Sequence, residues 1–150
     1  MFIGPNAESQ YDAAGTLTGF DYTKLDAFAN QFSGHDVVLM LNGIPPFRGQ
    51  PGSTEFTRDM KAYLDDLVPH MAALGFDTDH FALYPIDEPG GQGWGAVNRV
   101  VEFGKAVRAA HPKVMVYVDG GGELPMFQAM AAYIDIWCPG LGMLAAESPE

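Results

Sequence analysis

Five short apolar runs alternate with four segments of helical periodicity along this chain, and this alternation limits the possible folds more than any single motif. The runs begin near Phe2, Val37, Phe81, Val114 and Ile134. Several are apolar at successive positions, which is typical of parallel strands with both faces covered. Strand and helix segments that follow one another in this way predict an α/β fold with a parallel sheet.

The segments between the runs predict helices over residues 22–32, 54–74, 95–110 and 124–133. The second is the clearest, because Ser53 or Thr54 can cap its start and Gly75 is a natural stop. Residues 6–20 are polar and contain glycine, so we expect a loop with a turn at Asp12–Gly15. The residues after Gly140 predict the start of a further helix.

Two architectures satisfy this element order. One is part of a TIM (β/α)8 barrel, with about five parallel strands and four helices; a complete barrel needs about 250 residues. The other is a flavodoxin-like doubly wound sheet, with strand order 2-1-3-4-5 instead of a sequential one. The chain opens inside a strand, and its long loops follow strand carboxyl ends, which favours the barrel. We therefore expect one domain over residues 1–150 that is a piece of a barrel and can self-associate through its open edges.

Charge and composition exclude several kinds of partner. Eight basic residues stand against 19 acidic ones, a net charge of −11, which argues against binding to nucleic acid or to an anionic membrane. No apolar run is long enough for a membrane span. Cys138 is the only cysteine, which excludes an internal disulfide, and we expect it to be buried. The four histidines lack zinc-ligand spacing and Gly120–Gly122 lacks a nucleotide-binding context, so we expect no metal and no cofactor.

The stretch Phe81–Gly91, FALYPIDEPGG, places two carboxylates directly after a buried strand. In α/β folds, ligands bind and reactions occur at the carboxyl ends of the strands. Asp87 and Glu88 are adjacent and repel each other, which favours a proton on one of them and hence a general acid. An acidic turn that caps the next helix is the simpler explanation. Asn42 and Asp119 end two other predicted strands, so we expect them on the same rim as the acids.

Three phrases of the sequence resemble the catalytic barrel of glycoside hydrolases, above all family 123 and its relatives. These are LNG at Leu41–Gly43, YPIDEP at Tyr84–Pro89 and GTLTGFDYTKLDAF at Gly15–Phe28. The resemblance implies hydrolysis of O-glycosidic bonds, with N-acetylhexosaminides as substrates. It also implies a substrate-assisted mechanism, in which Asp87 orients the acetamido group and Glu88 is the acid/base. Such barrels place this pair after the fourth strand.

A carbohydrate substrate would need further contacts near the two acids. Asn42, Tyr84 and Asp119 are candidates for polar contacts, and Trp94 and Trp137 are candidate platforms for stacking on a sugar ring. Core packing is the competing explanation for both tryptophans. A barrel that binds carbohydrate without catalysis is the alternative function, and a small-ligand-binding flavodoxin-like domain is a further one.

Overall fold

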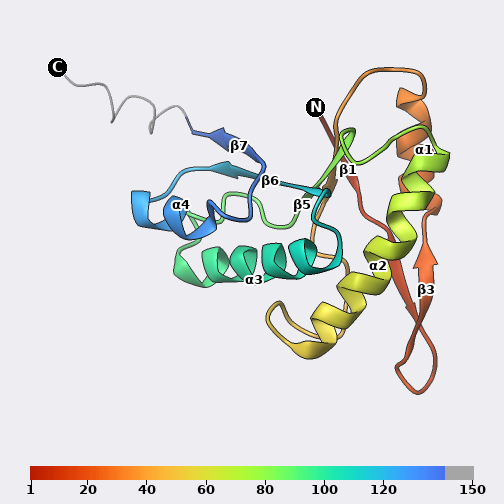
Figure 1. Cartoon of the computed structure of the whole chain (residues 1–150), viewed down its shortest axis with the longest axis horizontal. Helices are drawn as coiled ribbons and strands as arrows, with labels where there is room; N and C mark the ends of the chain where they lie inside the picture. Colours follow the sequence, from red (N-terminus) through yellow and green to blue (C-terminus); the bar gives the residue numbers. More distant parts are fainter. Residues whose placement is uncertain (141–150) are drawn as a thin grey trace.

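The structure, a computed structural model, describes residues 1–140 and consists of a five-stranded parallel sheet, a two-stranded antiparallel sheet and helices (Figure 1). The main sheet contains β1 (Phe2–Pro5), β4 (Leu39–Asn42), β5 (Phe81–Tyr84), β6 (Met115–Gly120) and β7 (Ile136–Pro139). The second sheet contains β2 (Glu8–Tyr11) and β3 (Leu17–Asp21). The helices are α1 (Thr23–Ala29), extended by the 3-10 turn η1 (Asn30–Phe32), then α2 (Thr54–Ala73), α3 (Trp94–Ala110) and α4 (Leu124–Met130). The helix expected after Gly140 lies outside the described residues.

The parallel strands lie side by side in the order in which they occur along the chain. The order is β1-β4-β5-β6-β7, and every neighbouring pair is parallel. A flavodoxin-type sheet has the order 2-1-3-4-5, which is not the order observed in residues 1–140. The sequential order is the one expected for consecutive strands of a barrel, and β1 and β7 form the edges of the described sheet.

The helices cover one face of this sheet. Leu41, Leu83 and Val116 lie in adjacent register and belong to a core that includes buried side chains from α1, α2, α3 and α4. The opposite face carries a small separate cluster built from strand residues alone, namely Met40, Ala82, Tyr84 and Tyr117 with Met115 and Ile136 beside them. In Figure 1, α3 and α4 lie along the same side of β6 and β7. We call the other face, which no described helix covers, the inner face, because it corresponds to the inside of a barrel.

The longest helix, α2, follows the sequence signals closely. The Ser53 hydroxyl accepts a hydrogen bond from the Phe56 N–H at 3.1 Å, which caps the first turn. Gly75 ends the helix with a φ of +93°, a conformation that glycine adopts without strain. The buried side chains recur at helical spacing: Phe56, Met60, Tyr63, Leu64, Leu67 and Met71. This face joins α2 to the sheet and explains why the helix was predictable.

Residues 8–21 form a hairpin, so the predicted loop was wrong in that part. The expected turn at Asp12–Gly15 is present, and it joins β2 to β3. The hairpin lies against α2, where Phe20 packs on Tyr63 at 5.2 Å between ring centroids. The strands are polar and mostly exposed at alternate positions, so the sequence carries too little apolar alternation to reveal them.

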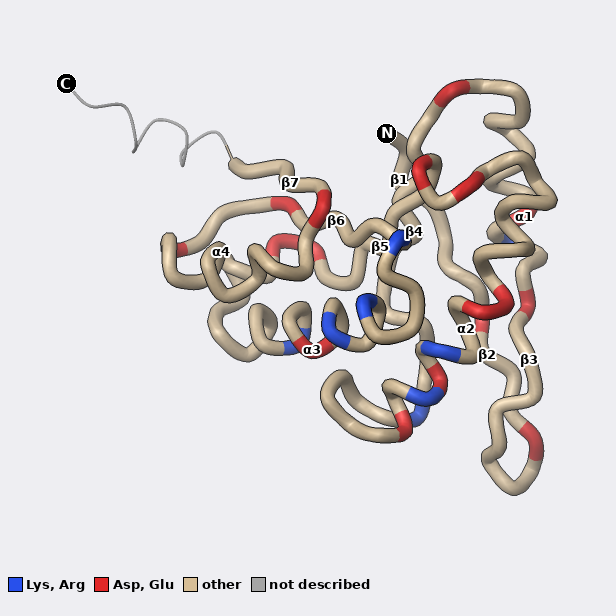
Figure 2. Tube along the Cα trace, in the orientation of Figure 1, with Lys and Arg blue, Asp and Glu red and all other residues tan. Residues whose placement is uncertain are grey.

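Several of the basic residues lie on two helices, α2 and α3. Figure 2 shows Lys and Arg on the first half of α2 and along α3, while Asp and Glu are spread over the loops, the hairpin and the helices, α2 included. No helix in residues 1–140 is both long and apolar enough to cross a membrane.

Candidate active site

The two adjacent acids lie on a tight turn at the carboxyl end of β5. The strand itself is fully buried, whereas Asp87 and Glu88 are exposed. Glu88 has a φ of +43° and is the only non-glycine residue with positive φ in residues 1–140. Left-handed backbone is unfavourable for a residue with a Cβ and persists only where surrounding contacts hold it. The turn is therefore held in place by its neighbours.

Local hydrogen bonds fix part of the turn. The Glu88 carbonyl accepts from the N–H of Gly91 at 3.1 Å and from that of Gln92 at 3.3 Å. The Gln92 side chain donates back to the Asp87 carbonyl at 2.6 Å. Gln92 is a contributor that the sequence did not indicate, because a polar residue in a glycine-rich loop has no distinguishing pattern.

The end of β6 supplies the remaining contacts. One carboxylate oxygen of Asp119, Oδ1, accepts the Glu88 N–H at 3.0 Å. The next residue, Gly120, has a φ of +85°, and a Cβ there would stand 2.8 Å from the Glu88 Cβ. A Cβ on Gly90 would stand 2.0 Å from the Gly121 carbonyl oxygen. The glycines after the two strands thus allow the β5 turn to dock directly on the backbone that follows β6.

Tyr84 joins the two strand ends through its hydroxyl group. The Tyr84 oxygen is 2.5 Å from Asp87 Oδ1 and 2.7 Å from Asp119 Oδ2. Burial, followed by hydrogen bonding to these carboxylates and by their charges, raises the pKa of Tyr84 far above its usual value. The phenol therefore stays neutral and able to donate at physiological pH. It has a single proton and donates it to one of the two carboxylates at a time.

A second tyrosine supports the first. Tyr117 packs edge-on against Tyr84 with 4.9 Å between ring centroids, on the inner face. Burial, followed by a hydrogen bond with the Cys138 side chain, raises the pKa of Tyr117. Cys138 itself is exposed, so the expectation that it is buried was wrong. It stands in register with Asp119 on the edge strand β7, where no further described strand covers it.

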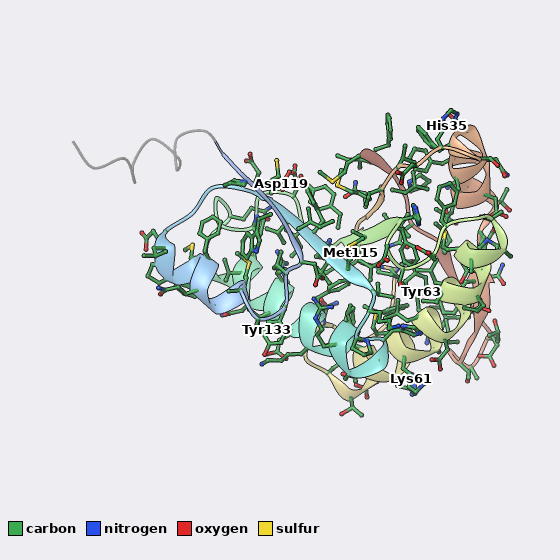
Figure 3. The ribbon with its side chains drawn as sticks, turned by 45° about the horizontal axis from the view of Figure 1, so that its top comes forward. His35, Lys61, Tyr63, Met115, Asp119 and Tyr133 are labelled. Atoms are coloured by element: carbon green, nitrogen blue, oxygen red, sulfur yellow. The ribbon has the colours of Figure 1, made fainter. Side chains whose placement is uncertain are left out.

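The structure brings together most of the residues expected on one rim. Tyr84, Asp87, Glu88 and Asp119 are in direct contact, and Figure 3 shows Asp119 and Met115 toward opposite ends of β6. Asn42 is exposed at the end of β4, in register with Tyr84. The shared rim is therefore confirmed, while the roles of these residues remain predictions.

The two tryptophans occupy different environments. Trp94 is the first residue of α3, at the end of the loop that carries the acids, and 45% of its surface is exposed. Trp137 lies in register with Val118, a residue of the helix-side core, and packs on Phe127 of α4 at 5.2 Å. Trp137 thus packs on the helix side of the sheet, away from the inner face, which favours the competing explanation of core packing.

Asn6 is a residue of this rim that sequence reasoning missed. Its side-chain amide donates to the Gly43 carbonyl at 3.0 Å, and its Oδ1 accepts a hydrogen bond from the buried Tyr63 hydroxyl. Asn6 thus fixes the turn that follows Asn42. The signal was available, since Asn6 directly follows β1, but it was assigned to a loop instead of to a strand end.

The described cavities lie away from the acids. One, of about 370 Å³, is lined by Gly15, Thr16 and Leu17 of the hairpin and by Arg58, Asp59 and Ala62 of α2. Another, of about 280 Å³, lies between α2 and α3. On the rim, Asp87 and Glu88 are exposed, Asp119 is half-buried and Tyr84 is buried. Within residues 1–140, no group of three or more His, Cys, Asp or Glu side chains is arranged to hold a metal ion.

Comparison with known proteins does not assign a family. A scan against protein-family models finds no match, and a search of curated proteins finds no significant similarity.

Proposed function

We propose that the rim formed by Asp87, Glu88, Tyr84 and Asp119 hydrolyses O-glycosidic bonds, with N-acetylhexosaminides as substrates. The observation that carries the proposal is the pair of adjacent carboxylates, held on a fixed turn at the carboxyl end of a parallel strand and joined by a phenol to a third carboxylate. In barrels this is the end at which catalytic residues are found. The resemblance of the YPIDEP stretch to glycoside hydrolases points to the same chemistry.

The contacts of Asp87 suit a role in holding an acetamido group. Its Oδ1 is bonded to Tyr84, while its Oδ2 has no protein hydrogen-bond donor within residues 1–140. A free carboxylate oxygen on an exposed residue can accept the N–H of a substrate acetamido group. That contact would aim the acetamido oxygen at the anomeric carbon, which replaces a nucleophile from the enzyme.

Glu88 supplies the proton transfers in this mechanism. In the first step the protonated Glu88 gives its proton to the glycosidic oxygen, the bond from that oxygen to the anomeric carbon breaks, and the acetamido oxygen bonds to the carbon. In the second step Glu88, now a carboxylate, takes a proton from water as the water oxygen attacks the anomeric carbon. The oxazolinium ring opens, the acetamide is restored, and Glu88 is protonated again.

Carbohydrate binding without catalysis is the second candidate function. The observation that favours it is the exposure of Asp87 and Glu88 at the carboxyl end of the sheet. Such a site can bind a sugar through Asn42, Trp94 and the carboxylates while leaving the glycosidic bond intact.

Kinetics of two variants test the proposal. Glu88→Gln is expected to lower kcat by about three orders of magnitude on an unactivated N-acetylhexosaminide disaccharide, and by much less on a 4-nitrophenyl glycoside, whose leaving group needs little protonation. Asp87→Asn is expected to slow both substrates, because it weakens the hold on the acetamido group. Glu55→Gln, which removes an exposed acid of α2, is the matched control. Turnover of the disaccharide by Glu88→Gln at the wild-type rate would refute the role of Glu88. Sugar binding by the wild-type protein without turnover would favour the second candidate.

A further inference from the structure

We infer that Asp119 is a positioning residue that holds both acids of the β5 turn, Glu88 through its backbone and Asp87 through Tyr84. The catalytic consequence of this inference rests on the function proposed above. The structural consequence does not, and it can be measured without a substrate.

Both oxygens of the Asp119 carboxylate are used, and they serve different partners. Oδ1 accepts the Glu88 N–H at 3.0 Å, which forms a backbone arm. Oδ2 is 2.7 Å from the Tyr84 hydroxyl, which in turn is 2.5 Å from Asp87, and this forms a phenol arm. One side chain on β6 therefore determines where two side chains on the neighbouring β5 turn can lie.

The backbone arm accounts for the conformation of Glu88. A glutamate at a φ of +43° lies in a sparsely populated backbone region. The turn would relieve this strain if Glu88 returned to a negative φ, and the Glu88 N–H would then move. The charged acceptor on Asp119 opposes that relaxation. The close approach of Gly120 to Glu88 and of Gly90 to Gly121 shows that the turn is docked on the end of β6 and does not project freely into solvent.

The charge pattern points to positioning and not to stabilisation. Asp87, Glu88 and Asp119 lie close together, and none of them takes part in an ion pair within residues 1–140. Asp135 at the other end of the sheet differs, although it also links two strands through a backbone N–H. It accepts from Val116 N–H at 2.7 Å and pairs with Arg108 at 2.6 Å. Asp135 is therefore the matched control for Asp119.

The first experiment is amide hydrogen exchange measured by NMR on the wild-type protein and on four variants. In the wild type, the Glu88 amide is expected to be protected despite the exposure of its residue. Asp119→Ala should raise its exchange rate at least tenfold while the core amides of β5 keep theirs. Asp119→Asn retains an acceptor oxygen and should restore most of the protection. Tyr84→Phe should leave Glu88 protected, because it removes only the phenol arm, and Asp135→Ala should leave it unchanged.

The second readout is catalytic. With a 4-nitrophenyl N-acetyl-β-hexosaminide, Asp119→Ala is expected to lower kcat about 100-fold with little change in KM, since small displacements of a catalytic group cost about that much. Asp119→Asn should recover part of the loss, and Asp135→Ala should retain the wild-type kcat once the folded fraction is taken into account.

The outcomes separate the two ideas. An unprotected Glu88 amide in the wild type, or equal exchange in wild type and Asp119→Ala, overturns the inference whatever the activity. An equal loss of kcat in Asp119→Ala and Asp135→Ala also overturns it, because the effect would then be one of general stability. If no protein turns over the glycoside while Asp119→Ala frees the Glu88 amide, the positioning stands and the proposed function fails. If Asp119→Ala does not fold, the wild-type protection and the Asp119→Asn variant decide the question.

Discussion

The two ends of the sheet differ in whether their acidic side chains have basic partners. At the amino end, Asp135 is paired with Arg108, and His80 lies within reach of both Asp77 and Asp36. At the carboxyl end, Asp87, Glu88 and Asp119 gather with no ion-pair partner among residues 1–140. In barrels the amino end contributes to stability and the carboxyl end carries out the chemistry. The difference suggests the same division here.

The two ends of the sheet also differ in backbone strain, which is found at the carboxyl end. The turn before β5 uses Gly75 at a φ of +93°, which costs little. The turn after β5 places Glu88 at +43°, where a side chain with a Cβ is strained. Backbone strain of this kind is common at functional sites, where holding a side chain in a particular orientation lowers the stability of the fold.

The largest expected effect separates activity from stability. Glu88→Gln should lower kcat on an unactivated N-acetylhexosaminide by about three orders of magnitude, equivalent to about 4 kcal/mol of transition-state stabilisation. Its free energy of unfolding should stay within about 0.5 kcal/mol of the wild type, because the exposed side chain makes no ion pair in residues 1–140. Steady-state kinetics together with urea unfolding would measure both. A Glu88→Gln protein that is fully active but unstable would reverse the contrast.

The opposite result is expected at the amino end. Asp135→Ala should lower the free energy of unfolding by about 2 kcal/mol, because it leaves the N–H of the buried Val116 without its side-chain acceptor and removes the pair with Arg108. Urea unfolding at 25 °C measures this. The exposed pair Glu102–Lys105 supplies the control, since Glu102→Ala should cost less than about 0.5 kcal/mol. Equal costs for the two variants would mean that Asp135 does not support the amino end.

A smaller effect of opposite sign is expected at position 88. Glu88→Gly should raise the free energy of unfolding by about 1 kcal/mol, since relief of the left-handed strain exceeds the entropy that glycine loses on folding. The thermal midpoint should rise by about 3 °C. Glu88→Ala keeps a Cβ and should show no such gain. A Glu88→Gly variant less stable than Glu88→Ala would indicate that the backbone at position 88 is not strained.

The smallest expected effect is a dependence of stability on pH at the amino end. A hydrogen bond that the ring donates to the Asp77 carboxylate, followed by the charges of Asp77 and Asp36, raises the pKa of His80 above its ordinary value of 6.5. A raised folded-state pKa means that the protonated histidine stabilises the fold below about pH 6.5 and that this contribution is lost as the pH rises through the folded-state value. The thermal midpoint of the wild type should therefore fall slightly more between pH 6 and pH 8.5 than that of His80→Gln. If the thermal midpoints of the wild type and of His80→Gln change equally with pH, the contact between His80 and Asp77 contributes nothing to stability.

The sequence predicted the main sheet and its helices but not the packing around the acids. Buried parallel strands such as Phe81–Tyr84 appear as continuous apolar runs, which makes them easy to locate. The same property hides which side chain faces which side, and for that reason the sequence left sugar stacking and core packing both open for Trp137. The polar hairpin of residues 8–21 lacks an apolar pattern altogether. The contact of Asp119 with the Glu88 N–H also depends on a left-handed backbone at Glu88, which no local sequence pattern indicates because glutamate rarely adopts it.

The most direct measurement of the central claim is a map of ligand binding by NMR. The probe is a thiazoline analogue of an N-acetylhexosamine, which mimics the cyclic intermediate of substrate-assisted hydrolysis. The account predicts saturable shifts of the amides of Asn42, Glu88, Gln92 and Asp119 at the carboxyl end of the sheet, with Asp87→Asn abolishing them. Shifts confined to the cavity beside Arg58 and Ala62, or no shifts at millimolar probe, would contradict it.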